Sequence, residues 1–354
     1  MAYEFGNDKK SAFQAQYDAQ KIAFAPIMFQ AARALRDLGI LETVKNHKQG
    51  ITIEEVADKL NLPVYGVKVL LEAGLSIELV YAKDHKFFIT KTGWFIMNDE
   101  LTKVNMDFTH DVNYLGFFKL KEAIKSGKPE GLKVFGDWNT IYAALSELPD
   151  HVRKSWFGFD HYYSDDSFPQ ALPIIFNNNP HKILDVGGNT GKFAIKCAEY
   201  NPNVKITILD LPGQLADAYK NINDKGLNER IDGYPIDLLD HSLPYPQNFD
   251  VVWMSQFLDC FSQDDIVELL KKAKAALNPD GAIYIMETFW DNQRTDAGRY
   301  SLVATSLYFT CMANGCSQMY HTQDMIDLIE KAGLKLDETF EKIGVSHTIF
   351  KCVI

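Results

Sequence analysis

The apolar positions in the first hundred residues recur at the spacing of α-helices. Between residues 25 and 44 they return every three or four positions, and Gly39 divides this stretch because glycine commonly ends a helix. Thr52 can cap a further helix over residues 53–60, with Glu55 three positions later as its capping-box partner. The pattern therefore predicts a chain that begins mostly helical.

Another helix over residues 64–75 and two short strands, over 79–81 and 86–90, follow in the sequence. Two short helices separated by a tight turn and followed by paired strands are typical of a winged helix. The helix over 64–75 carries Lys68 but no arginine, whereas a DNA reader needs Arg or Lys on phosphates and base edges. We therefore expect residues 1–103 to form a winged-helix domain for packing or dimerisation.

Residues 104–180 are expected to be mostly helical and are rich in aromatic side chains. These are Phe108, Tyr114, Phe117, Phe118, Phe135, Trp138, Tyr142, Trp156, Phe157, Phe159, Tyr162 and Tyr163. Such a cluster can line a pocket for a flat hydrophobic ligand, or it can be core that joins two domains. The sequence does not decide between these interpretations.

From residue 181 the pattern changes to buried strands that alternate with helices. The strands are expected over 182–186, 204–209, 249–254 and 281–286, and the helices over 192–200, 266–277 and 324–332. This alternation predicts a parallel sheet of the α/β class, with residues 343–353 as a strand of an edge hairpin. We expect this domain to cover residues 181–354.

The first of these strands leads into a glycine-rich turn. Gly187, Gly188 and Gly191 leave the backbone bare, so amide groups can approach a ligand beyond the carboxyl ends of the strands. Asp210 ends the next strand, where a carboxylate can accept both hydroxyls of a ribose. The glycines lack the Gly-x-Gly-x-x-Gly spacing of a dinucleotide site, and Asp185 would repel a pyrophosphate. A cation with an ammonium and a sulfonium, such as S-adenosylmethionine, fits this turn better.

The segment Leu-Asp-Val-Gly-Gly-Asn-Thr-Gly over 184–191, followed by Leu-Asp-Leu-Pro over 209–212, resembles the plant caffeate/flavonoid and hydroxyindole O-methyltransferase family. The resemblance extends over almost the whole chain. It implies a class I, Rossmann-like sheet of seven strands, S-adenosylmethionine as cofactor, and a homodimer formed through the N-terminal domain.

The resemblance also implies how the cofactor is held. Gly187 and the neighbouring backbone would contact its methionine part, and Asp210 would hold the ribose, with Leu211 in the same motif. Asp237 and Leu238 would flank the adenine.

One stretch departs from the family. Where the family has a His-Asp-Trp-Ser-Asp-Glu-like segment, residues 255–264 read Ser-Gln-Phe-Leu-Asp-Cys-Phe-Ser-Gln-Asp. Asp259 stands in the place of the catalytic histidine, and Ser255 replaces a lysine on the cofactor side. Asp259 is either a base whose pKa burial raises, or a cap of the helix that follows.

Other candidates for proton transfer lie elsewhere in the chain. Glu287 matches an acid that flanks the catalytic histidine in the family, whereas Tyr320 stands where the second flanking acid is expected. His321 follows it and is a third candidate base, and His110 in the aromatic segment is a fourth. No His, Asp or Glu cluster has the ligand spacing of a metal site, so we expect no metal.

Composition and charge indicate which partners and which cellular compartment are expected for this chain. The 354 residues carry a formal net charge of -11, which makes nucleic acid a poor partner. No apolar run is long enough to cross a bilayer, and the N-terminal segment does not resemble a signal peptide. The five cysteines are scattered, as is usual for free thiols in a reducing cytoplasm.

The sequence thus predicts S-adenosylmethionine-dependent methyl transfer to a hydroxyl of an aromatic or polycyclic small molecule. Asp259, Glu287 and His321 are the candidates for managing the proton. The alternative is a protein of this fold that binds the cofactor without methyl transfer, as a sensor or for another reaction. A DNA-binding regulator is disfavoured by charge.

Overall fold

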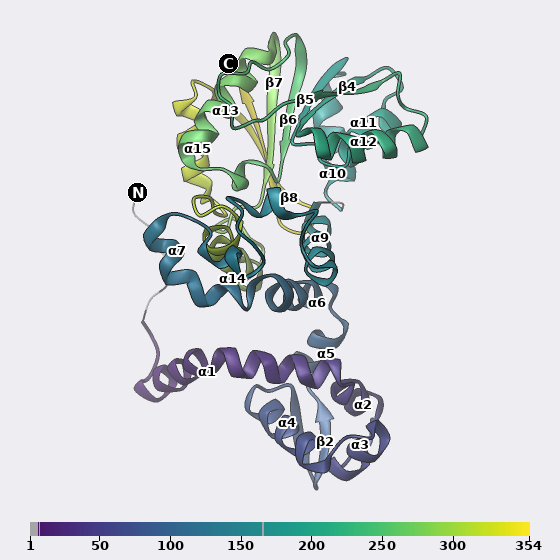
Figure 1. Cartoon of the computed structure of the whole chain (residues 1–354), viewed down its shortest axis with the longest axis vertical. Helices are drawn as coiled ribbons and strands as arrows, with labels where there is room; N and C mark the ends of the chain where they lie inside the picture. Colours follow the sequence, from purple (N-terminus) through teal and green to yellow (C-terminus); the bar gives the residue numbers. More distant parts are fainter. Residues whose placement is uncertain (1–5, 7, 165) are drawn as a thin grey trace. The chain divides into compact units, whose positions relative to one another are not determined.

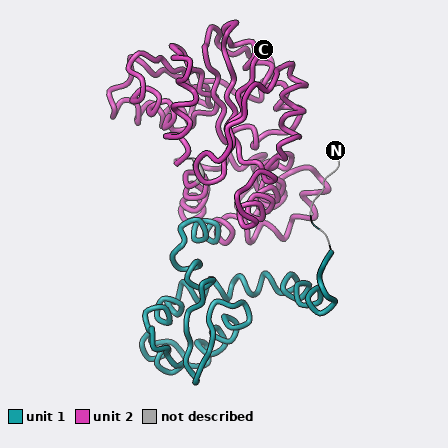
Figure 2. The backbone as a smooth tube through the Cα atoms, turned by 180° about the vertical axis from the view of Figure 1, so that it is seen from behind, with its two compact units in different colours: residues 1–107 teal, residues 108–354 magenta. Residues whose placement is uncertain are grey.

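The computed structural model describes residue 6, residues 8–164 and residues 166–354, which divide into two compact units. Unit 1 covers Met1–Asp107 and unit 2 covers Phe108–Ile354 (Figure 2). The further division at residue 180 stays a prediction. Among the described residues, no helix combines the length and apolar character needed to span a membrane.

Unit 1 consists of helices followed by a small hairpin and two further helices. The elements are α1 (Ala12–Asp37), α2 (Ile40–Asn46), α3 (Ile53–Leu60), α4 (Val64–Ser76), β1 (Val80–Lys83), β2 (Lys86–Ile89), α5 (Lys91–Asn98) and α6 (Glu100–Asp107). The capping box at the start of α3 forms as the sequence predicts. The Glu55 amide donates to Oγ1 of Thr52 over 3.2 Å, and the Thr52 amide donates to Oε2 of Glu55 over 2.8 Å.

Unit 2 begins with short helices that enclose an aromatic core. They are η1 (Phe108–Asn113), η2 (Gly116–Lys119), α7 (Leu120–Ser126), η3 (Glu130–Val134), α8 (Ile141–Ala144), α9 (Asp150–Ser164), α10 (Phe168–Ile175) and η4 (Phe176–Asn178). Two later elements, α14 (Asp296–Tyr308) and η6 (Phe309–Ala313), pack into the same core. Both η1 and η6 are π-helices, which occur mostly as short insertions near functional sites.

The rest of unit 2 is a seven-stranded sheet with the order β5-β4-β3-β6-β7-β9-β8. Its strands are β3 (Lys182–Val186), β4 (Lys205–Asp210), β5 (Ile231–Pro235), β6 (Phe249–Ser255), β7 (Leu277–Glu287), β8 (Lys335–Ile343) and β9 (His347–Val353). All pairs are parallel except those of β9, which runs antiparallel to β7 and β8. The seven-stranded α/β sheet that the resemblance implies is therefore confirmed.

Helices cover both faces of this sheet. They are α11 (Lys192–Tyr200), α12 (Pro212–Asp224), α13 (Gln263–Ala276) and α15 (Thr322–Lys331). Figure 1 shows α13 and α15 on one side of the strands and α10, α11 and α12 on the other, and the two buried clusters of apolar side chains divide in the same way. The strands between these layers are buried on both faces, as parallel strands usually are.

The hydrophobic pattern of the sequence did not predict the two outer strands, β5 and β8. Both β5 and β8 are mostly exposed, so they carry little apolar signal. The strand expected over residues 343–353 in an edge hairpin is present as β9, which pairs antiparallel with β8 and lies between β7 and β8. The charged strand β8 takes the edge, where charged side chains discourage pairing with another chain.

Candidate active site

The glycine-rich turn after β3 has a backbone that only glycine fits. Gly187 and Gly191 have φ angles of 73° and 75°, in the left-handed region. A Cβ on Gly187 would lie 2.4 Å from the ring of Phe257, and one on Gly188 would lie 2.7 Å from Oδ2 of Asp185. The turn therefore exposes bare main chain at the carboxyl end of the sheet.

Asp185 lies under this turn as a buried carboxyl group. Its Oδ2 atom has no hydrogen-bond partner among the described residues. Burial, together with the nearby carboxylate of Asp210, raises the pKa of Asp185 to about 8. An ionised carboxylate in such a place needs a cation beside it. This orphaned oxygen therefore fits the ammonium or sulfonium of S-adenosylmethionine.

Asp210, at the end of β4, anchors the turn from the neighbouring strand. Its Oδ2 accepts a hydrogen bond of 2.8 Å from the amide of Asn189, and its Oδ1 accepts one of 2.7 Å from the amide of Leu211. Burial raises the pKa of Asp210 above its ordinary value, and these two bonds oppose that shift. Each carboxylate oxygen has further acceptor capacity for a ribose hydroxyl.

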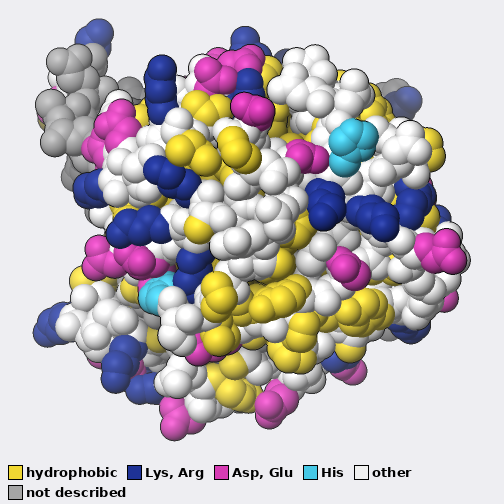
Figure 3. Space-filling model, turned by 90° about the horizontal axis from the view of Figure 1, so that it is seen from above, with side chains coloured by type: hydrophobic (Ala, Val, Ile, Leu, Met, Phe, Trp, Pro, Cys, Tyr) yellow, Lys and Arg dark blue, Asp and Glu magenta, His cyan; other side chains and the backbone are white. Residues whose placement is uncertain are grey.

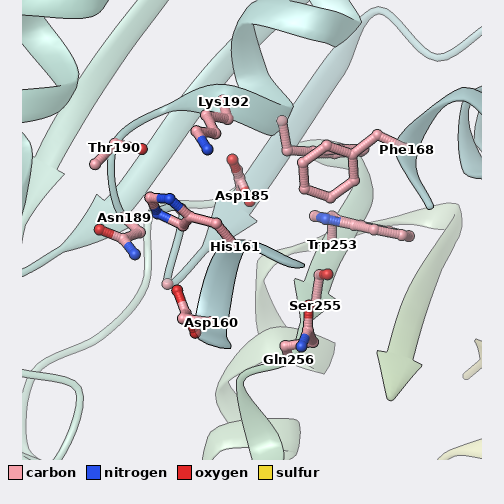
Figure 4. Close-up of a pocket in the computed structure, with 13 residues that line it drawn as sticks. Asp160, His161, Phe168, Asp185, Asn189, Thr190, Lys192, Trp253, Ser255 and Gln256 are labelled. Atoms are coloured by element: carbon pink, nitrogen blue, oxygen red, sulfur yellow. The ribbon is translucent and has the colours of Figure 1, made fainter. Parts of the chain in front are cut away.

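A small cavity of about 90 Å³ opens beside the turn (Figure 4). Asp160 and His161 reach it from α9, Asp185 from β3, and Lys192 from the start of α11. Ser255 and Gln256 close it at the end of β6. Side chains of both charge signs around so small a space suit the amino-acid end of the cofactor, which carries both an ammonium and a carboxylate.

A larger cavity of about 800 Å³ lies next to the small one and shares Asp160, Gly187 and Asn189 with it. Its wall includes Asp210 and Leu211 after β4, and Asp237 and Leu238 after β5. The Asp237 carboxylate also accepts a bond of 3.0 Å from the amide of Leu239. This part of the wall follows the strand ends where the sequence places the ribose and the adenine.

The remaining wall of the large cavity is rich in aromatic side chains. They are Phe108, Tyr142, Trp156, Phe157, Phe159, Phe257, Phe261, Tyr308 and Phe309. The indole Nε1 of Trp156 donates a hydrogen bond of 2.7 Å to the hydroxyl of Tyr308. The Tyr142 hydroxyl is buried beside the Cys260 thiol. Part of the aromatic segment therefore lines a pocket and part of it is core.

Asp259 lies in a short 3-10 helix, η5 (Leu258–Cys260), and lines the large cavity. Burial raises the pKa of Asp259 to about 7, and the carboxylate of Asp160 adds to the rise. The Cys260 thiol opposes it by donating to Oδ1 of Asp259 over 3.4 Å. Asp259 does not cap the following helix, because Oγ of Ser262 accepts the Asp265 amide at the start of α13.

Glu287, the last residue of β7, lies behind the cavity wall. Its Oε1 accepts bonds of 3.0 Å from the amide of Phe257 and 2.8 Å from the amide of Leu258. Burial and the neighbouring Asp259 raise the pKa of Glu287 well above its ordinary value. Glu287 is therefore placed to hold the main chain that carries Asp259.

Two family models match this chain. One is described as the O-methyltransferase domain and covers residues 117–335, and the other is described as the Dimerisation2-like domain and covers residues 16–87. The chain belongs to the O-methyltransferase domain family. It is an S-adenosylmethionine-dependent methyltransferase with a dimerisation domain at its N-terminus.

Curated relatives and solved structures extend along most of the chain. The L-tyrosine C(3)-methyltransferase of Streptomyces lavendulae is 25% identical over 328 residues, which are 91% of this chain and 87% of that protein. The acetylserotonin O-methyltransferase of Homo sapiens is 22% identical over 83% of this chain and 82% of its own. The apo structure of the S-adenosylmethionine-dependent methyltransferase SibL matches with a TM-score of 0.73 and 25% identity, over 95% of this chain and 98% of its own.

In this O-methyltransferase, most of the site residues expected from the sequence lie at the two cavities. Asp185, Gly187, Gly188 and Ser255 line the small one, and Asp210, Leu211, Asp237, Leu238 and Asp259 line the large one. Gly191, Glu287 and His321 are not among the described residues that line either. Gly191 instead takes the left-handed conformation at the N-cap of α11.

The two candidate histidines lie away from these walls. His321 caps α15, where its Nδ1 accepts the Gln323 amide over 3.0 Å and its Nε2 lies 3.4 Å from Oδ2 of Asp291. His110 contacts the carboxylate of Asp111, with 2.7 Å between Nδ1 and Oδ1. Neither is among the described residues that line the cavities.

The aromatic pattern indicated Trp156 and Phe157 of α9 as candidate pocket residues, but it did not single out Arg153, Asp160 and His161 on the same helix. Arg153, Trp156, Phe157 and Asp160 line the large cavity, and Asp160 and His161 also reach the small one. The first four are spaced i, i+3, i+4 and i+7, which places them on one face of the helix. That spacing is visible in the sequence, but only the fold shows that this face meets a cavity.

Proposed function

We propose that this methyltransferase acts on a hydroxyl of an aromatic or polycyclic small molecule, with Asp259 as the base. The observation that carries the proposal is the position of Asp259 in a cavity with aromatic walls, where burial raises its pKa to about 7. The cavity is large enough for the acceptor and the adenosyl group together, since ligand sites commonly measure about 300–1,000 Å³.

The raised pKa removes the main objection to an aspartate base. A phenol has a pKa of about 10, so transfer of its proton to an ordinary Asp is uphill by roughly 8 kcal/mol. With the pKa of Asp259 at about 7, the same transfer is uphill by roughly 4 kcal/mol. Transfer of the same proton to a histidine of ordinary pKa is uphill by roughly 5 kcal/mol. With its pKa raised by burial, Asp259 is therefore about as strong a base as the histidine that the family uses.

The cofactor supplies, when bound, a methyl group on a positively charged sulfur. We assign its methionine part to Asp185, Ser255 and the backbone of 187–191, and its ribose to Asp210 and Leu211. Asp237 and Leu238 would flank the adenine. The aromatic wall would hold the acceptor, Asp259 would accept the hydroxyl proton, and Glu287 would position the chain at 257–259. His321 has no part in this scheme, because it caps α15 and is not among the described residues that line the cavities.

The names of several relatives favour an aromatic acceptor. A 3-hydroxy-5-methyl-1-naphthoate 3-O-methyltransferase of Streptomyces sahachiroi is 29% identical over 68% of this chain. The L-tyrosine C(3)-methyltransferase favours a second candidate, methylation of a ring carbon. Removal of the phenolic proton by Asp259 serves both, because a phenolate is nucleophilic at oxygen and at the adjacent carbon.

We further propose a cytoplasmic homodimer formed through a winged helix in unit 1, without nucleic acid as a partner. The matched dimerisation model covers residues 16–87, and α1 carries exposed apolar side chains that a second copy can cover. These are Phe13, Tyr17, Ile22, Phe24 and Ile27. Charges of both signs are interspersed on the face in Figure 3, which does not favour a polyanion. The five cysteines are free, as a reducing compartment requires.

Turnover with a panel of phenols tests the proposed reaction. Purified protein, S-adenosylmethionine and each acceptor are incubated, S-adenosylhomocysteine is measured, and the product is examined by NMR for the position of the new methyl group. An O-methyl product supports the first candidate and a ring-methyl product the second. Cofactor binding by calorimetry without turnover on any acceptor would favour the alternative of a protein that binds the cofactor for another purpose.

A further inference from the structure

We propose that Arg153 forms a subsite for a carboxylate on the acceptor, so that the substrate is an aromatic acid. This inference rests on the proposed function, because it concerns the molecule that occupies the large cavity. Arg153 enters that cavity from the first turns of α9. Neither the family motifs nor the resemblance assigns it a role.

One face of α9 places a cation, two aromatic rings and a carboxylate in this order along the cavity wall. Arg153 comes first, Trp156 and Phe157 follow, and Asp160 comes last. Asp160 comes seven positions after Arg153, which corresponds to a rise of about 10 Å along the helix. A cation and a carboxylate thus lie at opposite ends of an aromatic surface whose length suits one or two fused rings.

Arg153 is the one lysine or arginine among the described residues that line the large cavity. The carboxylates there divide into two groups. Asp210, Asp217 and Asp237 follow β4 and β5, where the adenosyl part belongs, whereas Asp259 lies with the aromatic wall and Asp160 lies where the two cavities meet. An acceptor carboxylate would be repelled by these two and attracted to Arg153, so the acid would enter with its hydroxyl toward Asp259.

The guanidinium of Arg153 has capacity for such a ligand. Its Nη2 donates to Oδ1 of Asp150 over 2.8 Å, but the Asp150 side chain is 94% exposed. An exposed ion pair of this kind contributes little to stability, so it does not commit the guanidinium. A guanidinium has five N–H donors and can hold a second carboxylate through a two-bond fork. The Arg153 side chain is itself 43% exposed, so a ligand can reach it.

Two pairs of acceptors, whose members differ in the presence of the carboxylate, test its contribution to binding. In 6-hydroxy-2-naphthoate and L-tyrosine the carboxylate and the hydroxyl lie at opposite ends, and 2-naphthol and tyramine lack the carboxylate. Equilibrium binding of all four is measured by calorimetry in the presence of S-adenosylhomocysteine, for the full-length wild type, R153Q and R153K. Turnover, where it occurs, gives kcat and KM for the same pairs.

We expect R153Q to weaken the binding of at least one of the two acids by about tenfold more than that of its partner without the carboxylate, mainly in Kd and KM, while R153K recovers part of the loss. The control K154Q removes the same charge from an exposed neighbour on α9 and should not separate an acid from its partner without the carboxylate. Equal losses on an acid and on its partner without the carboxylate, or failure of both acids to bind, would overturn the subsite. Charge-dependent binding without turnover would leave the subsite standing and count against the proposed reaction alone.

Discussion

Glu287 and Leu258 are joined by a hydrogen bond of 2.8 Å, in which the backbone amide of Leu258 donates to Oε1 of Glu287. The residue after Leu258 is Asp259, so the end of β7 determines where the proposed base lies. The same oxygen holds the amide of Phe257, whose ring lies where a side chain on Gly187 would be. One buried acid therefore connects the cofactor turn with the acceptor cavity.

Substitutions of Glu287 should separate the contribution of its hydrogen bonds to the free energy of unfolding from that of its charge. Burial raises the pKa of Glu287 well above its ordinary value and so favours the uncharged carboxyl group, and Glu287→Gln keeps an acceptor oxygen of similar shape. We expect Glu287→Gln to change the free energy of unfolding by less than about 1 kcal/mol, and Glu287→Ala to lower it by about 2–5 kcal/mol, since two amides lose their acceptor. Urea denaturation at pH 7 measures both. Equal stability of the two variants would show that these bonds contribute little.

Asp259→Asn should lower kcat by about 100-fold or more while cofactor affinity changes less than about threefold, because the variant loses the proton acceptor. In the wild type kcat should rise with pH through about 7, since only the ionised Asp259 accepts a proton, and this rise should disappear in the variant. Asp264→Asn, in the exposed first turn of α13, is the matched control. Unchanged turnover in Asp259→Asn would place the base elsewhere.

Asp210→Ala should weaken S-adenosylmethionine binding at least about tenfold, a loss of about 1.4 kcal/mol. The variant loses the ribose acceptor and also frees the amides of Asn189 and Leu211, so the turn loses an anchor. Calorimetric titration measures the affinity, and Asp224→Ala at the exposed end of α12 controls for charge. Wild-type affinity in Asp210→Ala would contradict this placement of the ribose.

Asp185 should make the stability of the cofactor-free protein depend on pH. Its folded pKa of about 8 lies above the ordinary value of 3.8, so the folded state binds the proton more tightly. The contribution of this group to the free energy of unfolding is therefore fully present below about pH 4 and is lost as the pH rises through 8. Thermal unfolding from pH 5 to 8 measures it.

We expect Asp185→Asn to flatten that pH dependence and to stabilise the cofactor-free protein at pH 8 by about 1–3 kcal/mol, because no ionised group is left buried. The same variant should bind S-adenosylmethionine less tightly. If the wild type and Asp185→Asn lose stability in parallel between pH 5 and 8, the carboxyl group is not the titrating site.

The cofactor residues that the sequence groups together lie in short segments of the chain. Gly187, Gly188 and Asp210 belong to consecutive strand and turn segments, and parallel strands bring their carboxyl ends to one edge wherever such segments pair. The N-cap of α3 was likewise predictable, since Thr52 and Glu55 are three residues apart. The exposed strands β5 and β8 were missed because they carry little apolar signal.

The sequence by itself determined the alternation of the buried strands with helices in the sheet domain, the bare turn at 187–191, and the absence of a histidine at 259. Local periodicity and glycine conformation carry this information. Only the tertiary structure decided that α9 forms a wall of both cavities, that Ser262 rather than Asp259 caps α13, and that His321 lies outside the cavities. It also decided the raised pKa of Asp259, because desolvation depends on neighbours that are distant in the chain and that meet only when the helices pack.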